Sequence, residues 1–134
     1  MYIGIDCGTQ STKGVLWHEG IVVASSSVPH TLQSDSTGKK EQHPNQWYLA
    51  MLKAIENLIY QCPHSKQHLK GIGVSGQQHG LVILDKDDRV IRDSLLWCDT
   101  RPTQELQAFV SKHAIDFHLR LGIHVPVAFT IAKL

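Results

Sequence analysis

The sequence predicts a mixed α/β fold, in which a small sheet carries helices. Three short segments rich in β-branched residues follow one another at the start of the chain, joined by tight turns. A long amphipathic segment comes next, and further strand-sized segments follow it. The order β-β-β-α-β is typical of a mixed sheet with helices packed on it.

The first three strands are expected at residues 2–7, 13–18 and 21–28. Glu19 and Gly20, between the last two, are a hairpin signal. The three strands should therefore form an antiparallel meander.

A polar loop is expected from Pro29 to Gln42, and a helix begins after it. Pro44 stands at the first helical position, where proline is favoured. Apolar side chains then recur at helical spacing to about Cys62. They are Trp47, Met51, Ala54, Ile55 and Leu58.

Shorter elements are expected in the rest of the chain. A second helix opens at Pro102, and residues 129–134 resemble a helix start with Thr130 as its cap and no stop signal. We therefore expect the chain to be the front part of a longer protein. Further strands are predicted at 69–75, 81–84, 90–91 and 95–97.

The composition indicates an ordinary globular domain. The 134 residues are 42% hydrophobic and 19% charged, with a net charge of +1, which offers no basic surface for nucleic acid or an anionic membrane. No apolar segment is long enough to span a bilayer, and no signal peptide is expected. Three scattered cysteines favour a reducing cytoplasm, and no Cys or His spacing favours zinc. We expect a cytoplasmic protein without a nucleic-acid or membrane partner.

A candidate phosphate-binding turn follows the first strand. Alternation places Gly4 and Asp6 on one face of this strand and Ile5 on the other. A carboxylate that ends an apolar strand needs a partner, and a hydrated Mg²⁺ needs few carboxylates. Gly8 allows close approach of a ligand, and the following amides and hydroxyls can donate to phosphate. A plain hairpin turn is the alternative. The candidate residues are Asp6, Gly8, Thr9, Gln10, Ser11, Thr12 and Lys13, with Mg²⁺ on Asp6 through water.

A second polar loop is a candidate sugar site. Gln77, Gln78 and His79 lie between two glycines and offer both donors and acceptors, as the hydroxyls of a polyol require. A solvated connection is the alternative.

A third segment, around Trp97, could complete the sugar site. The Trp97 ring can stack on the C–H face of a sugar. Asp99 and Arg101 could bind hydroxyls or hold each other, and a helix cap with a surface ion pair is the alternative.

Together these motifs resemble the FGGY family of carbohydrate kinases. Residues 4–13 resemble the first phosphate motif of the actin, Hsp70 and hexokinase superfamily, in the form that FGGY kinases have. Residues 73–80 and 96–101 resemble the xylulokinase branch of that family. The segments Glu41-Gln42-His43-Pro44…Trp47 and 128–134 also resemble family motifs, so the resemblance covers essentially the whole chain. Departures from the family pattern occur at Cys7, Cys98, Ala128, Ile131 and Ala132.

The resemblance implies a ribonuclease H-like, actin-like ATPase fold in an incomplete copy. Residues 1–134 would be part of the N-terminal domain, with the C-terminal FGGY domain absent. ATP and Mg²⁺ are the implied cofactors, and a ketopentose, most of all D-xylulose, is the implied substrate. Gln78 and His79 would contact the ketose, and Trp97 would line its pocket.

The resemblance also implies that the catalytic base lies beyond Leu134, so the isolated chain should be inactive. Two alternatives stay open. The kinase could act on ribulose, gluconate, glycerol or fructose instead. The chain could also be a non-catalytic binding module, and its uncovered surface could then form a homodimer.

Overall fold

The computed structural model describes residues 1–113 and 116–133, which form two compact units. The first unit contains Met1–Thr31 and Pro44–Gln77, and the second contains Leu32–His43 and Gln78–Leu134. Among the described residues, no helix has the length and apolar character needed to cross a bilayer.

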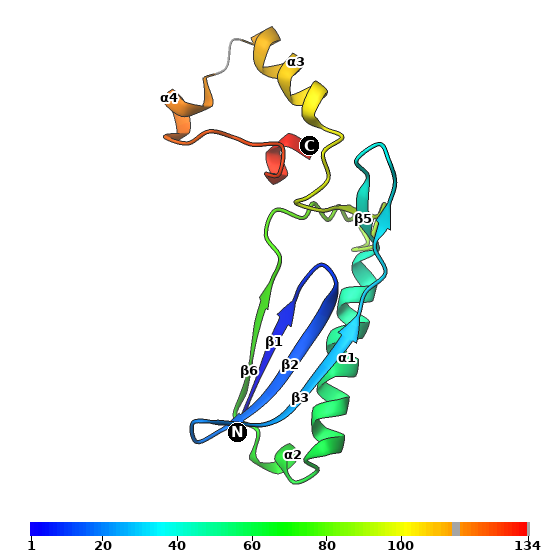
Figure 1. Ribbon diagram of the computed structural model, residues 1–134, viewed down its shortest axis with the longest axis vertical. Coiled ribbons are helices and arrows are strands. Elements are labelled where there is room, and N and C mark those ends of the chain that lie inside the picture. Colours follow the sequence, from blue (N-terminus) through cyan, green and yellow to red (C-terminus); the bar gives the residue numbers. More distant parts are fainter. Residues whose placement is uncertain (114–115, 134) are drawn as a thin grey trace. The chain divides into compact units, whose positions relative to one another are not determined.

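The first unit is built on a four-stranded sheet with the order β3-β2-β1-β6 (Figure 1). The predicted meander is confirmed, because β1 (Tyr2–Cys7), β2 (Ser11–His18) and β3 (Ile21–Pro29) pair antiparallel in sequence. The fourth strand, β6 (Gly71–Gly76), pairs parallel with β1. The second strand begins at Ser11, two residues before the expected start.

The hairpin between β2 and β3 is also as predicted. Glu19 and Gly20 both have positive φ angles, 46° and 89°. Positive φ at both central residues suits the right-handed twist of the two strands that they join.

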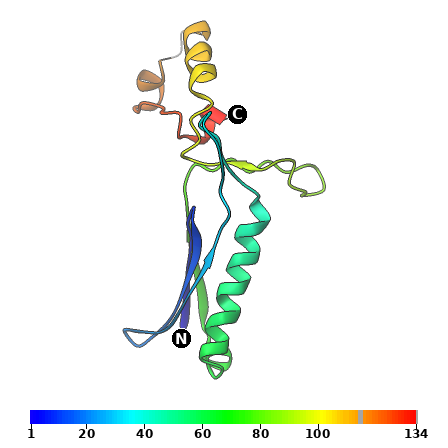
Figure 2. The ribbon, with the colours of Figure 1, turned by 45° about the vertical axis from the view of Figure 1, so that its right-hand side comes forward.

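Helix α1 (Pro44–Gln61) covers one face of this sheet (Figure 2). The helix can lie close to β2 because Gly14 has no side chain; a Cβ there would lie 3.1 Å from Leu58 Cδ1. A short helix, α2 (Ser65–His68), then leads to β6. The core between helix and sheet consists of Ile3, Ile5, Leu16, Ala24, Ala54 and Leu58.

The second unit contains a three-stranded antiparallel sheet, which the sequence did not predict in this form. Its strands are β4 (Gln33–Ser34), β5 (Lys40–Gln42) and β7 (Ser94–Leu95), in that order. The prediction of one polar loop from Pro29 to Gln42 was therefore wrong in part. The strands are too short and too polar to give a periodic pattern, and β5 buries the carboxylate of Glu41, which is paired with Lys39 and Arg101.

Two predicted strands of the second unit are reduced to single bridges. Residues 81–84 and 90–91 form isolated bridges, Leu81 with Leu95 and Leu84 with Val90, and the N–H of Ile91 donates to the carbonyl of Ile83 at 3.0 Å. The reason is the turn at Asp85, whose carboxylate accepts the N–H groups of residues 87 and 89 and so closes a tight loop between them.

The helices of the second unit are short. Helix α3 (Thr103–His113) follows Pro102 as predicted, whereas α4 (Phe117–Leu121) was not predicted. The expected helix at 129–134 is a single turn of 3₁₀ helix, η1 (Thr130–Lys133), and Leu134 lies outside the described residues.

We predict that Leu58→Ala destabilises the first unit by about 2–5 kcal/mol, because it leaves a cavity between α1 and the sheet. Leu58 is fully buried, whereas Leu49 on the same helix is 61% exposed. Leu49→Ala is therefore the matched control, with an expected change within about 0.5 kcal/mol. Urea unfolding followed by far-ultraviolet circular dichroism measures both. Equal shifts of the two midpoints would contradict this packing.

Candidate functional site

The turn between β1 and β2 is closed by main-chain hydrogen bonds. The N–H of Gly8 donates to the carbonyl of Ser11 at 3.0 Å. The N–H of His30, just after β3, donates to the carbonyl of Gln10 at 2.7 Å. The turn is therefore held both internally and by the strand that returns beside it.

Asp6 lies on the sheet face opposite α1. Its neighbours across the ladders are Lys13 on β2 and Ser75 on β6. An open hollow of about 500 Å³ lies here, and two glycines, Gly4 and Gly73, leave its floor without side chains. An exposed carboxylate beside an ammonium group and a glycine-lined floor can receive a hydrated cation together with an anionic group.

Thr12 faces the interior of the first unit. Its side chain is fully buried, and its Oγ1 lies 2.9 Å from His30 Nε2 and 3.5 Å from Cys7 Sγ. Burial lowers the pKa of His30, although main-chain groups of Gly8 and Thr9 act in the opposite direction. The Thr12 hydroxyl therefore holds the turn together from inside.

Sequence reasoning missed His30. Among the described residues, its Nδ1 has no hydrogen-bond partner although it is buried. The sequence predictions for histidines concern metal-like spacing and the sugar loop at His79, and neither points to His30. The signal that could have found His30 is topological, because the third strand of a meander ends beside the turn after the first.

The remaining predicted phosphate residues differ in exposure. Thr9 is partly buried, and its hydroxyl donates to Gln77 Oε1 at 2.8 Å, which ties the turn to the residue after β6. Gln10 and Lys13 are exposed, and Ser11 is partly buried. The turn thus presents side chains to solvent on one side and is fastened to the sheet on the other.

The loop that carries His79 belongs to the second unit. His79 has a φ of 60°, which only a few per cent of non-glycine residues adopt. Its ring stacks on Phe129, with centroids 4.2 Å apart and planes 14° apart. Lys133 Nζ donates to the carbonyls of His79 and Ala128, both at 2.7 Å. Gln78, which precedes His79, is exposed.

Sequence reasoning gave Phe129 and Lys133 no role. The structure places both at the His79 loop. Burial lowers the pKa of Lys133, while the negative charge of Asp99 acts to raise it. Residues 128–134 resemble a family motif, and this resemblance could have drawn attention to Phe129 and Lys133. It does not indicate which residues they contact.

Trp97 extends from a firmly held segment. Its side chain is 49% exposed, whereas Leu96 and Asp99 on either side of it are fully buried. The N–H of Leu96 donates to the carbonyl of Lys40 on β5 at 3.0 Å. The Trp97 residue is thus half exposed, while the main chain before it is anchored.

Asp99 and Arg101 bind each other, which is one of the possibilities that the sequence predicted. A terminal guanidinium nitrogen of Arg101 donates to Asp99 Oδ2 at 2.7 Å, and the main-chain N–H of Arg101 donates to Asp99 Oδ1 at 3.0 Å. The main-chain N–H of Lys40 also donates to Oδ2, at 2.9 Å. The Asp99 carboxylate is therefore saturated from within the unit.

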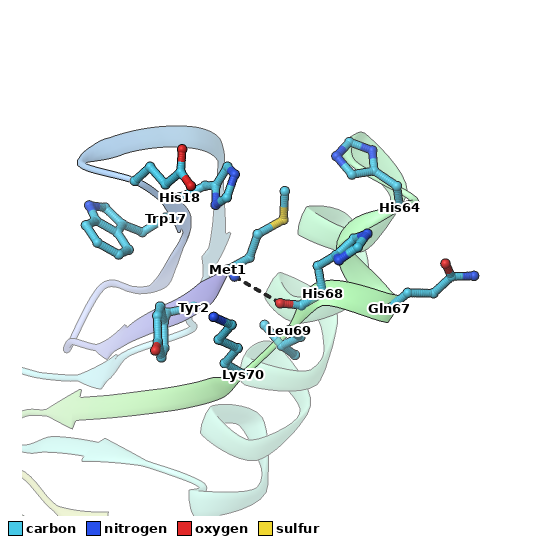
Figure 3. A pocket seen from close by; sticks show the side chains of 10 residues that line it. Met1, Tyr2, Trp17, His18, His64, Gln67, His68, Leu69 and Lys70 are labelled. Carbon is cyan, nitrogen blue, oxygen red and sulfur yellow. Dashed lines mark hydrogen bonds between the residues drawn. The ribbon is translucent and has the colours of Figure 1, made fainter.

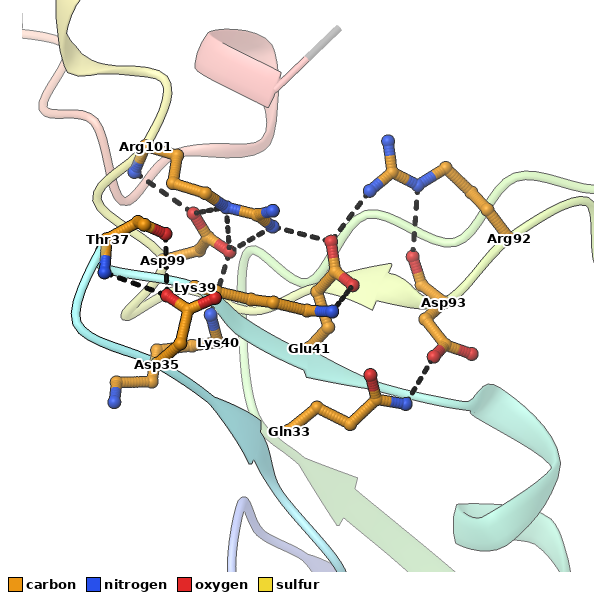
Figure 4. Close-up of polar contacts among 10 residues, drawn as sticks. All are labelled: Gln33, Asp35, Thr37, Lys39, Lys40, Glu41, Arg92, Asp93, Asp99 and Arg101. Carbon is orange, nitrogen blue, oxygen red and sulfur yellow. Dashed lines mark hydrogen bonds and ion pairs between the residues drawn. The ribbon is translucent and has the colours of Figure 1, made fainter.

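Glu41 joins the same group of charges, which we call the Glu41 cluster (Figure 4). Arg101 and Arg92 both donate to its Oε1, and Lys39 lies 3.3 Å from its Oε2. Glu41 is 6% exposed, on the short strand β5. The cluster comprises Lys39, Glu41, Arg92, Asp99 and Arg101.

The electrostatics of the cluster favour its charged form. Burial by itself raises the pKa of Glu41 and of Asp99, but the hydrogen bonds and charge of Arg101, together with Lys39 at Glu41 and the main-chain N–H of Lys40 at Asp99, outweigh it and lower both values. Hydrogen bonds to Asp99 and Glu41 in turn raise the pKa of Arg101. All three groups are thus ionised near neutral pH.

A further hollow lies beside Met1 and Tyr2 at the start of β1, whereas the phosphate turn follows its end. Figure 3 shows side chains that line this hollow. The hollow has a volume of about 640 Å³, and Tyr2, Trp17 and Lys70 are among the residues that line it. The amino group of Met1 donates to the carbonyl of His68 at its wall, at 2.9 Å. It contains no residue of the predicted phosphate or sugar sites. In the part of the chain that the structure describes, no three carboxylate, imidazole or thiol groups could hold a metal ion together.

The predicted site residues therefore fall into two sets. The turn from Asp6 to Lys13 lies in the first unit. Gln78, His79, Trp97, Asp99 and Arg101 lie in the second unit, and the boundary runs between Gln77 and Gln78.

Residues 1–134 match the family model of the N-terminal domain of the FGGY family of carbohydrate kinases. The chain is 41% identical to the xylulose kinase of Haemophilus influenzae, over 100% of its own length and 29% of that protein. It thus spans less than a third of the length of this relative.

Solved structures show the same similarity. A xylulose kinase from Rhodospirillum rubrum matches with a TM-score of 0.87 at 30% identity, over 98% of this chain and 28% of that one. A gluconate kinase from Lactobacillus acidophilus matches with a TM-score of 0.78 at 28% identity, over 98% of this chain and 27% of that one. The expected α/β, actin-like ATPase fold is confirmed.

We predict that acid destabilises the second unit through the Glu41 cluster. The folded-state pKa values of Glu41 and Asp99 lie below the ordinary 4.5 and 3.8, so the unfolded chain binds more protons as the pH falls. The stabilisation is complete above these ordinary values and disappears as the pH falls through the lowered ones. Urea unfolding of the second unit, followed by NMR at several pH values, measures this.

Glu41→Gln should flatten this acid dependence, because the variant has one titrating group fewer in the cluster. Glu56→Gln makes the same chemical change in an exposed ion pair on α1 and should leave the dependence unchanged. If wild type and Glu41→Gln lose stability equally between about pH 6 and about pH 3, the assignment is wrong.

Proposed function

Because this chain belongs to the FGGY family of carbohydrate kinases, we propose that it supplies the phosphate turn and part of the sugar site of a ketopentose kinase. The reaction transfers the γ-phosphate of ATP to a sugar hydroxyl, with D-xylulose as the first candidate substrate. The observation that carries this proposal is Asp6, which lies exposed on the open sheet face beside a closed, hydrogen-bonded turn.

The first unit would bind the phosphates. The turn from Gly8 to Ser11 offers main-chain and side-chain donors, and Lys13 lies across the ladder from Asp6. The single carboxylate fits Mg²⁺, which keeps several waters and needs few protein ligands. When bound, Mg²⁺ would neutralise charge on the phosphate oxygens. Thr12 would contribute by holding the turn from inside, through His30.

The second unit would bind the sugar. Gln78 presents an exposed amide that both donates and accepts, and Trp97 presents a half-exposed ring for the C–H face of a sugar. His79 is held in place by Phe129 and Lys133, so its ring position is defined before a ligand binds. Sugar contacts from Asp99 and Arg101 stay a prediction, and their mutual bonds favour a supporting role.

The relatives support D-xylulose as the substrate, and other substrates stay open as alternatives. The relatives cited above include xylulose kinases, and one structural neighbour is a gluconate kinase. Ribulose, gluconate, glycerol and fructose remain candidates, as does a non-catalytic binding module. The cytoplasmic location and the homodimer also stay predictions.

We predict that D-xylulose changes the fluorescence of Trp97. Trp97→Phe should abolish the response at millimolar sugar, because the stacking indole is the reporter. Trp17→Phe is the matched control, since Trp17 is similarly exposed, at 41% against 49%, and lies in the first unit. A full response in Trp97→Phe would count against this ring as the pocket wall, and a stronger response to gluconate would change the substrate class.

We predict no measurable phosphoryl transfer by the isolated chain. Transfer depends on positioning and on electrostatic stabilisation by several groups, and the proton-accepting Asp is expected beyond Leu134. A coupled assay of ADP release with D-xylulose and MgATP tests this against a heat-treated sample. Turnover above that background would show that the chain carries its own base.

A further inference from the structure

We propose that Glu41 is a positioning residue for the sugar site, and that it acts through Arg101 and Asp99 on the segment that carries Trp97. The proposal rests on the function proposed above. Glu41 would not touch the sugar, because its carboxylate is 6% exposed and is occupied by three cationic side chains.

Arg101 is the physical link between Glu41 and this segment. One terminal nitrogen of Arg101 donates both to Glu41 Oε1 and to Asp99 Oδ2, and its Nε also reaches the Asp99 carboxylate (Figure 4). The planar guanidinium can bridge two carboxylates in this way, whereas an ammonium group is a single compact charge. The two carboxylates come from β5 and from the segment after β7.

The same two segments are joined along their main chains. Glu41 pairs with Leu95 in the ladder between β5 and β7. The N–H of Leu96 donates to Lys40 O at 3.0 Å, and the N–H of Lys40 donates to Asp99 Oδ2 at 2.9 Å. Trp97 thus stands between two anchored points, one in the main chain and one at the carboxylate that Arg101 holds.

The other two cations of the cluster do not make this link. Lys39 pairs with Glu41 from the residue just before β5, two positions earlier in the chain, and its side chain is 30% exposed. Arg92 donates to Glu41 Oε1 and to the carbonyl of Asp93, and its side chain is 49% exposed. Among the described contacts of these three cations, only Arg101 binds both Glu41 and Asp99.

The contacts of Glu41 would affect the sugar site through the position of the Trp97 ring. A stacking ring contributes only when its plane is held at the ligand, and small displacements of positioned groups reduce activity strongly. Removing the charge of Glu41 leaves the Arg101 guanidinium, whose side chain is 33% exposed, with one carboxylate partner fewer. The Trp97 segment would then lose one of its anchors.

The test uses the indole N–H signals in ¹H–¹⁵N spectra of the whole chain. The three tryptophans are Trp17, Trp47 and Trp97, and the first two lie in the first unit as internal references. Glu41→Gln and Arg101→Lys should shift and broaden the Trp97 signal alone. Both should also weaken D-xylulose binding, on the order of tenfold.

Each variant has a matched control. Glu56→Gln makes the same change in the exposed Lys53–Glu56 pair, and Arg92→Lys makes the same change at the other arginine on Glu41. Both controls should keep the Trp97 signal and the affinity. Glu41→Asp, which retains the charge, should restore part of both. If Glu41→Gln does not fold, Arg101→Lys decides the result.

Two outcomes overturn the proposal. The first is an unchanged Trp97 signal in Glu41→Gln and Arg101→Lys. The second is a changed signal with unchanged D-xylulose affinity, which would make the cluster a structural element without a role in the site. If the wild-type chain does not bind D-xylulose, the proposed function is contradicted instead. The Trp97 signal of the variants would then still show whether Glu41 positions the Trp97 segment.

Discussion

The burial of one face of the sheet determines what the first unit can do. Helix α1 covers the face that carries Ile3, Ile5 and Leu16. Because side chains alternate along a strand, Asp6 must then lie on the opposite face, at the end of β1 where the turn begins. A register shift of one residue would bury the carboxylate and expose the core. The apolar contact of α1 with the sheet therefore places the group on which the proposed metal and phosphate site depends.

The second unit reaches a defined structure by different means. Its strands are two or three residues long, and the buried carboxylate of Glu41 on β5 is neutralised by neighbouring cations. Buried ion pairs add little net stability, but removing one partner is costly. Such a cluster suits a site that needs a few groups held in fixed positions. Lys133 follows the same principle at the His79 loop, where it joins two carbonyls.

The first unit was largely predictable from the sequence, and the second was predictable in part. Periodic apolar residues identified the meander, α1 and the outward face of Asp6, since burial on one face leaves a repeating pattern. The inward face of Thr12 and its contact with His30 depend on strand register, which a linear pattern does not display. Glu41 stands 60 residues from Arg101, so only the folded chain shows their contact. Likewise, the motif around Lys133 was visible as a resemblance, but its target at His79 was not.

The most direct test of this account is a pair of titrations of the ¹⁵N-labelled chain, one with MgATP and one with D-xylulose. MgATP should shift the amide signals of residues 6–13, and Asp6→Asn should weaken this response. D-xylulose should shift the signals of Gln78, His79 and Trp97. Shifts by either ligand that centre on the hollow beside Met1 and Trp17, or no shift with both ligands at millimolar concentration, would contradict it.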